Sequence, residues 1–164
     1  MKVQRSTNLK ENFISLDPGS AGTGFALFLS GKAPYETKIL EYKNPEGTWQ
    51  QRCDFICLAL RHEIRQRSWL RAVYCEQPQY MSTFKGITAA QSGSLFKLCT
   101  LYGRFIEIAY SLNVPFFPVE IPKYKGQLSK EQVKYRVSKI LPGKVYTSHA
   151  LDAVSIGLWV KGLF

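Results

Sequence analysis

The hydrophobic pattern begins with two apolar runs separated by a turn. The first run, Phe13-Ile14-Ser15-Leu16, ends on Asp17, and Pro18-Gly19 follows; the second, Phe25-Ala26-Leu27-Phe28, comes after Gly22 and Gly24. Apolar runs on either side of a glycine-bearing turn predict two antiparallel strands. A third strand is expected over about 37–42, after the turn Gly31-Lys32-Ala33-Pro34.

Helices are predicted where apolar residues recur every three or four positions. Thr48 and Gln51 form a capping box, which predicts a helix from there to about residue 66. A longer helix is expected over 94–112, and it alternates with strands over 70–76 and 115–119.

The last third of the chain predicts two more helices. Ser129 with Gln132 makes a second capping box, and Pro142-Gly143 ends the helix that it begins. Ser148 is expected to cap the final helix. The polar, glycine-containing stretch 79–93 is expected to be a loop, and 121–126 is a short basic segment. Three strands followed by alternating helices and strands predict an α/β fold: a mixed five-stranded sheet flanked by helices.

The amino-acid composition indicates which classes of binding partner suit this protein. The chain has 164 residues, with 22 Lys and Arg against 12 Asp and Glu, which gives a net charge of +10. We expect one domain over 1–164, with 1–12 as a polar N-terminal arm. Such a basic excess points to a polyanion, with nucleic acid favoured over a membrane surface. No apolar stretch has the length of a membrane span or a signal-peptide core, so we expect a cytoplasmic protein.

The four cysteines (Cys53, Cys57, Cys75 and Cys99) lack the spacing of a zinc site, and we expect reduced, buried thiols.

Two carboxylates end neighbouring strands of the predicted sheet. Asp17 and Glu76 each follow an apolar strand, and a parallel arrangement of those strands would bring both to one carboxyl edge. Asp152 and His149, three residues apart, share one face of the last helix. Singly, each has a plain structural explanation: a turn, a strand end, a helix N-terminus or a surface position. Together, three carboxylates and an imidazole would suit Mg²⁺ or Mn²⁺, and a pair of ions suits phosphodiester cleavage.

Four motifs in order carry a resemblance to a known family. They are Leu16-Asp17-Pro18-Gly19-Ser20, Tyr74-Cys75-Glu76-Gln77, Lys130-Glu131-Gln132-Val133 and Ser148-His149-Ala150-Leu151-Asp152-Ala153. From residue 13 to about 159 the chain resembles the RuvC family of Holliday junction resolvases, within the RNase H-like superfamily. The resemblance is to compact, phage-type members most of all.

The resemblance implies a function and a set of site residues. Asp17, Glu76, His149 and Asp152 would hold two divalent metal ions, Mg²⁺ or Mn²⁺, and Lys130 would lie near the scissile phosphate. A second lysine at the phosphate would be Lys123 or Lys125. An aromatic residue, Tyr80 or Phe84, would stack on an unpaired base, and Lys85 in the same stretch would contact DNA. The family implies a homodimer that nicks opposite strands of four-way DNA junctions at symmetric positions, in the host cytoplasm if the protein is phage-encoded.

Other functions remain open from the residues alone. An RNA–DNA hybrid nuclease or a transposase core would use the same carboxylates. Asp-x-Gly followed by glycines is also typical of actin-like and sugar kinases, although these need two such domains. The non-enzymatic alternative is a basic protein that binds branched DNA without cleaving it.

Overall fold

The fold is a mixed five-stranded sheet. A computed structural model describes residues 12–31, 33–41, 44, 46–79 and 84–164. The strands are β1 (Phe13–Asp17), β2 (Gly22–Phe28), β3 (Pro34–Glu41), β4 (Ala72–Glu76) and β5 (Phe116–Val119), in the order β3-β2-β1-β4-β5. The three N-terminal strands pair antiparallel, whereas β1, β4 and β5 run parallel. The predicted mixed sheet, with its N-terminal hairpins, is therefore confirmed.

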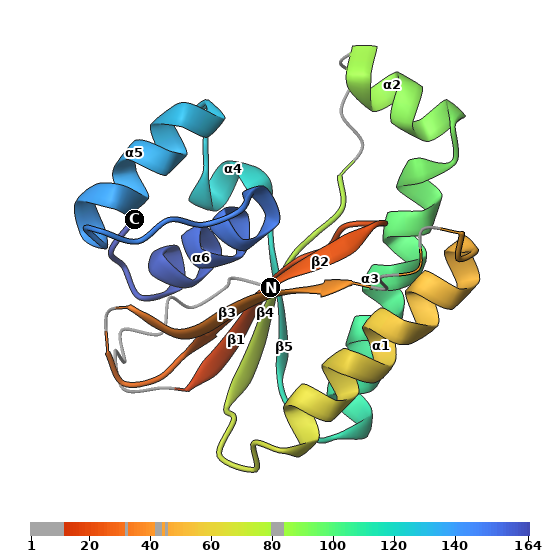
Figure 1. Cartoon of the computed structure of the whole chain (residues 1–164), viewed down its shortest axis with the longest axis horizontal. Helices are drawn as coiled ribbons and strands as arrows, with labels where there is room; N and C mark the ends of the chain where they lie inside the picture. The colour runs from red at the N-terminus through yellow and green to blue at the C-terminus, as the bar shows by residue number, and fades with distance from the viewer. Residues whose placement is uncertain (1–11, 32, 42–43, 45, 80–83) are drawn as a thin grey trace.

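Helices cover both faces of this sheet (Figure 1). Two of them, α1 (Trp49–Arg65) and α3 (Ser94–Ser111), pack on one face. The other face carries α6 (Ser148–Val160), which is flanked by α4 (Ile121–Tyr124) and α5 (Lys130–Ile140). Among the described residues, no helix combines the length and the apolar character needed to cross a bilayer.

Both predicted capping boxes are present, but two local predictions are wrong. Thr48 caps α1 and Ser129 caps α5, each with the reciprocal glutamine contact. The cap position of α6 is Thr147, so Ser148 is the first helical residue. The predicted loop 79–93 contains an eight-residue helix, α2 (Phe84–Gln91). Its sequence, Phe-Lys-Gly-Ile-Thr-Ala-Ala-Gln, is too short for a clear apolar period, although its alanines favour helix.

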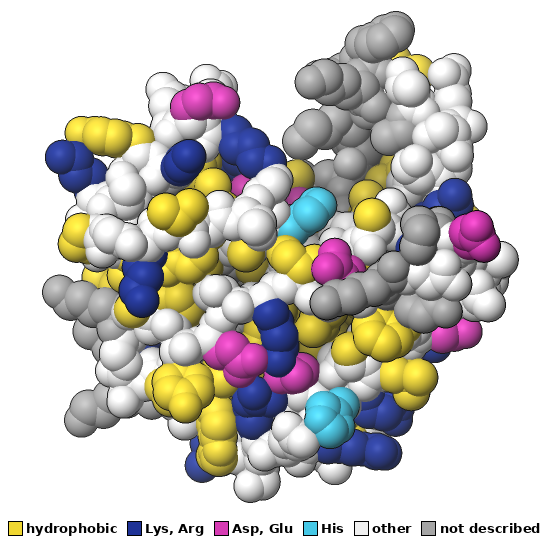
Figure 2. Space-filling view, in the orientation of Figure 1, with side chains coloured by type: hydrophobic (Ala, Val, Ile, Leu, Met, Phe, Trp, Pro, Cys, Tyr) yellow, Lys and Arg dark blue, Asp and Glu magenta, His cyan; other side chains and the backbone are white. Residues whose placement is uncertain are grey.

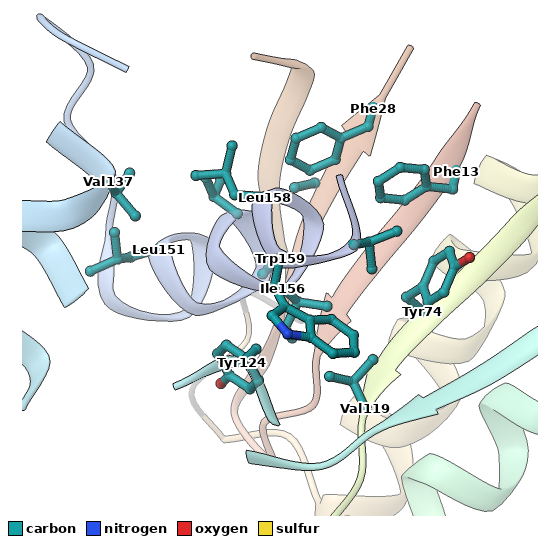
Figure 3. Close-up of a cluster of buried hydrophobic side chains, with 14 of the residues drawn as sticks. Phe13, Phe28, Tyr74, Val119, Tyr124, Val137, Leu151, Ile156, Leu158 and Trp159 are labelled. Atoms are coloured by element: carbon teal, nitrogen blue, oxygen red, sulfur yellow. The ribbon is translucent and has the colours of Figure 1, made fainter. Parts of the chain in front are cut away.

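The two faces of the sheet form two separate hydrophobic clusters. Alternate side chains of a strand point to opposite faces. Ile14 and Leu16 of β1 accordingly belong to the cluster under α1 and α3, whereas Phe13 belongs to the cluster under α6. Figure 3 shows this second cluster, in which Phe13, Phe28 and Tyr74 of the sheet lie against α6. The same alternation directs Ser15 and Asp17 toward α6.

Two glycines allow α6 to lie unusually close to the sheet. A Cβ atom on Gly157 of α6 would lie 2.0 Å from a ring carbon of Phe28. A Cβ atom on Gly24 of β2 would lie 2.0 Å from the backbone oxygen of His149. The Phe28 ring cannot move aside easily, because it is fully buried and stacked on Phe13. The His149 oxygen cannot move aside either, because it belongs to the backbone. Glycine is therefore required at both positions for this seating of the helix.

Gly157→Ala should lower the free energy of unfolding by about 1–3 kcal/mol, because overpacking of the Phe28 ring outweighs the helix propensity gained. Urea unfolding followed by circular dichroism measures the effect. The matched control is Gly103→Ala, in the interior of α3, where a Cβ atom would meet nothing within 4 Å. That variant should be stabilised by up to about 1 kcal/mol. Equal stability changes in the two variants would contradict the close approach.

Candidate functional site

The strand register places Asp17 and Glu76 side by side. β1 and β4 pair in parallel, with Leu16 opposite Cys75, so the next residue of each strand is a carboxylate at the carboxyl edge. Both strands end there. Residues that share a register position in neighbouring parallel strands point to the same face, which here is the face covered by α6. The sequence-based expectation about these two positions is confirmed for the backbone.

The first turns of α6 bring His149 and Asp152 to the same edge. Ser15, two residues before Asp17 on β1, donates a hydrogen bond of 2.7 Å from its buried hydroxyl to the Ala153 backbone oxygen. This bond fixes the helix to the strand one residue beyond Asp152. Gly24, which pairs with Asp17 across β1 and β2, lies directly beneath the His149 backbone. Close backbone contacts thus hold the helix start over the strand end.

Each of the three carboxylates contacts a different polar partner. His149 Nδ1 lies 2.7 Å from Asp17 Oδ2. The Tyr124 hydroxyl donates a hydrogen bond to Glu76 Oε2. Lys125 Nζ lies 3.2 Å from Asp152 Oδ1. Two of these partners are neighbours in the chain, at the end of α4, so that this short helix touches the site at two points.

The carboxylates also affect one another's ionisation. Burial raises the pKa of Asp17, and the Asp152 charge adds to this, while the His149 hydrogen bond opposes it. Burial, followed by the Asp17 charge, raises the pKa of Glu76 to about 7, against the opposing Tyr124 hydrogen bond. The hydrogen bond to Asp17 raises the pKa of His149. The site therefore concentrates negative charge in a poorly hydrated place, which favours bound cations.

The donor set fits a hard divalent cation by its chemistry. Three carboxylates and one imidazole are the ligand types that Mg²⁺ and Mn²⁺ accept. As the side chains stand, no group of three or more His, Cys, Asp or Glu in the described part of the chain is arranged to hold an ion together. Their oxygens are instead turned toward Tyr124, Lys125 and His149. A common ion would require these side chains to rotate toward one another.

The predicted lysines lie at different distances from the carboxylates. Lys125 contacts the site directly, whereas Lys123 pairs with Glu120 on the outer side of its own helical turn, at 2.6 Å. Lys130, at the start of α5, donates to the Ser148 hydroxyl next to His149. Of the two lysines between which the sequence could not choose, Lys125 is the one that contacts a carboxylate of the site.

Three predicted DNA-contacting residues cannot be placed as side chains. Tyr80 lies outside the described residues, and Phe84 and Lys85 belong to α2, whose side chains at these positions are likewise undescribed. Sequence reasoning missed Tyr124 as a site residue, because a four-residue helix has no period from which to read its inward face. It also missed Ser15, although a polar residue two positions before Asp17 on an apolar strand shares its face.

The surface is recessed over this edge of the sheet. Figure 1 shows α2 on one side of the edge where β1 and β4 end, and α4 with α5 on the other. In the same orientation, Figure 2 shows a hollow between these parts, with Lys or Arg, acidic and His side chains on the side toward α4 and α5. The hollow therefore lies over the edge at which β1 and β4 end.

The four cysteines differ in solvent exposure. Cys53, Cys57 and Cys75 are buried free thiols, as expected, but Cys99 is exposed on α3.

Comparison with known sequences gives a relative over most of the chain. No family model matches. The crossover junction endodeoxyribonuclease RuvC of Chloroherpeton thalassium (strain ATCC 35110 / GB-78) is 28% identical over 136 residues, which cover 78% of this chain and 68% of that protein.

Solved structures give the same relationship at the level of the fold. Thermus thermophilus RuvC in complex with a Holliday junction substrate matches with a TM-score of 0.71 and 20% identity, over 93% of this chain and 97% of the other. A second Thermus thermophilus RuvC structure matches with a TM-score of 0.63 and 19% identity, over 90% and 91%. The yeast mitochondrial Holliday junction resolvase Ydc2 matches with a TM-score of 0.60 and 12% identity, over 94% and 78%.

These matches agree with the resemblance predicted from four short motifs, and they extend it to the whole sheet and its helices. The chain therefore has the fold of these RuvC structures, and its sequence is similar to that of a RuvC.

Proposed function

We propose that this protein is a divalent-metal-dependent endonuclease that resolves four-way DNA junctions by paired, symmetric nicks. The observation that carries the proposal is the meeting of Asp17, Glu76 and Asp152 at one open edge of a sheet whose fold matches junction resolvases. The sequence relative is itself a crossover junction endodeoxyribonuclease. The net charge of +10 suits a nucleic-acid substrate.

In this proposal Asp17, Glu76, Asp152 and His149 hold two Mg²⁺ or Mn²⁺ ions. Two such ions, when bound, stabilise the attacking and the leaving oxygen of a phosphodiester. The protein's own part is to keep the carboxylates ionised and close together. Before an ion binds, His149 and Lys125 contact Asp17 and Asp152. Lys130, at the start of α5, contacts Ser148 beside His149 and is available to bind the phosphate.

DNA binding away from the chemistry is assigned to the basic residues around α4 and α5. Lys123 and Lys130 are exposed, the first on α4 and the second at the start of α5. Phosphate contacts from such lysines give affinity without sequence preference. The stacking role stays with Tyr80 or Phe84, and Lys85 stays a further candidate for the phosphate backbone.

Substrate choice separates this proposal from its alternatives. Equal amounts of a synthetic four-way junction, an RNA–DNA hybrid and a linear DNA duplex should be incubated with the protein in Mg²⁺ or in EDTA. Junction cleavage that needs Mg²⁺ supports a resolvase, and preferred cleavage of the hybrid would support an RNA–DNA hybrid nuclease. Junction binding without cleavage, in Mg²⁺ as well as in EDTA, would support the non-catalytic DNA-binding protein.

Removing one carboxylate should abolish cleavage and leave DNA binding intact. Asp17→Asn, Glu76→Gln and Asp152→Asn each delete a metal ligand charge while they preserve side-chain size and the basic surface. We expect cleavage rates to fall at least about 100-fold, since one lost electrostatic contact in an active site costs on the order of 3–4 kcal/mol. Junction affinity in Ca²⁺, measured by gel shift, should change less than about threefold.

Two further variants should reduce the cleavage rate less than the carboxylate variants do, and they serve for comparison. His149→Ala removes a neutral or singly charged ring and should reduce cleavage less than Asp17→Asn. Lys130→Ala should lower cleavage by weakening the phosphate contact, with no loss of folding because its side chain is exposed. Wild-type cleavage rates in the three carboxylate variants would contradict the site.

We also propose a homodimer, because paired nicks on opposite strands need two sites. Exposed aromatic residues on α3 support this: Phe96 is 76% exposed and Tyr110 is 66% exposed. Contiguous exposed apolar surface is typical of protein–protein interaction sites, and these two residues, about four turns apart, lie on nearly the same side of the helix. Phe105, on the same helix, is fully buried in the core and is therefore unsuitable as an interface residue. A two-fold dimer would match the two-fold symmetry of an open junction.

The double variant Phe96→Glu/Tyr110→Glu should be a folded monomer, because both side chains are exposed and their loss costs the core nothing. Light scattering after size exclusion gives the mass, and circular dichroism verifies the fold. The matched control is Tyr135→Glu on α5, which is 62% exposed and on the other face of the sheet, and it should remain a dimer. A wild-type monomer that makes paired cuts at high dilution would contradict the dimer.

A further inference from the structure

Lys125 differs from the neighbouring lysines in where its charge lies. Its side chain is 22% exposed and the side chain of its partner Asp152 is 13% exposed, with 3.2 Å between Nζ and Oδ1. Lys123, two residues earlier, is 40% exposed and pairs with Glu120, which is 43% exposed. One lysine is thus directed into the carboxylate cluster, and the other is directed outward.

The charge of Lys125 acts on the whole cluster. It lowers the pKa of Asp17 and of Glu76, although burial and the mutual repulsion of the carboxylates raise both more strongly. Its position is fixed by the preceding residue, because the buried Tyr124 side chain reaches Glu76. The end of α4 thus holds an ammonium group among three carboxylates.

An ammonium in this place and a metal ion on Asp152 exclude one another to a large extent. The Asp152 carboxylate that contacts Lys125 is the one that would bind the ion, and two cations so close together repel strongly where water is scarce. The lysine side chain has several rotatable bonds, so it can leave the carboxylate without any movement of the backbone.

We propose that Lys125 is an internal counter-cation of the site, which a divalent ion must displace from Asp152 in order to bind. The displaced ammonium then stays at the edge of the site, where it can neutralise a phosphate. This inference rests on the proposed function in assigning Asp152 as a metal ligand. It gives Lys125 two opposite effects: it weakens metal binding in the free protein and supports cleavage in the complex with DNA.

Metal affinity without DNA tests the first effect separately from activity. Isothermal titration of the full chain with Mn²⁺ should show tighter binding to Lys125→Met than to wild type, on the order of tenfold, because a competing charge is gone. Lys123→Met is the matched control: it removes the same charge from the same turn, and its Mn²⁺ affinity should change less than about twofold. Lys125→Arg, which keeps the charge, should bind Mn²⁺ as wild type does.

Junction cleavage at saturating Mn²⁺ tests the second effect. Lys125→Met should cleave more slowly than wild type although it binds the metal more tightly, a combination that a merely structural role would not produce. Circular dichroism verifies folding, and Lys125→Gln replaces the variant if the methionine disturbs it.

Different results overturn different parts. Mn²⁺ affinity in Lys125→Met equal to or weaker than wild type, with wild-type cleavage intact, overturns the counter-cation alone. Tighter binding in Lys125→Met, with a wild-type protein that cleaves no junction, keeps the counter-cation and contradicts the proposed function. Failure of every variant and of the wild type to bind Mn²⁺ overturns both.

Discussion

The seating of α6 on the sheet is the constraint on which the site depends. Asp17 is fixed at the end of a central strand, but His149 and Asp152 reach it only because the helix start approaches β2 to backbone contact over Gly24. Gly157 allows the same approach further along the helix, over Phe28. The hydrogen bond from Ser15 to Ala153 then sets how far the helix slides along β1. The packing of the core and the positions of the candidate site residues therefore depend on the same helix placement.

Once α6 is in this position, the charges of the three carboxylates require polar or cationic groups around them. Three carboxylates in a poorly hydrated edge raise the free energy of the folded state unless they are protonated or matched by cations. The same burial and the neighbouring Asp17 charge raise the pKa of Glu76 to about 7. Three groups offset this cost, each by contact with a different carboxylate: the Tyr124 hydroxyl, the Lys125 ammonium and the His149 ring. In the proposed function a metal ion would replace these partners on the carboxylates, so that the partners would influence its affinity.

Much of this could be predicted from the sequence, for reasons that differ by element. Strong apolar runs fixed the strands β1, β2 and β4, and the capping boxes at Thr48 and Ser129 fixed two helix starts, because each is a local signal. The edge position of Asp17 and Glu76 followed from parallel pairing, which is a rule of topology. The helix α2 was missed because eight residues hold barely two turns of periodicity. The contact of Tyr124 with Glu76 joins residues 48 positions apart, and no local pattern contains it.

The choice between Lys123 and Lys125 shows where sequence reasoning ends and geometry begins. Both residues belong to the same basic segment, and composition gives them equal weight. In the structure, Tyr124 between them is buried against Glu76, which turns the one lysine inward and leaves the other beside Glu120. Although the two lysines are only two residues apart, the charge of Lys125 lies in the carboxylate cluster, whereas the charge of Lys123 is screened by solvent. Fold likeness at 12–20% identity does not determine such contacts, so the chemistry of this site depends on the side chains that this chain itself places there.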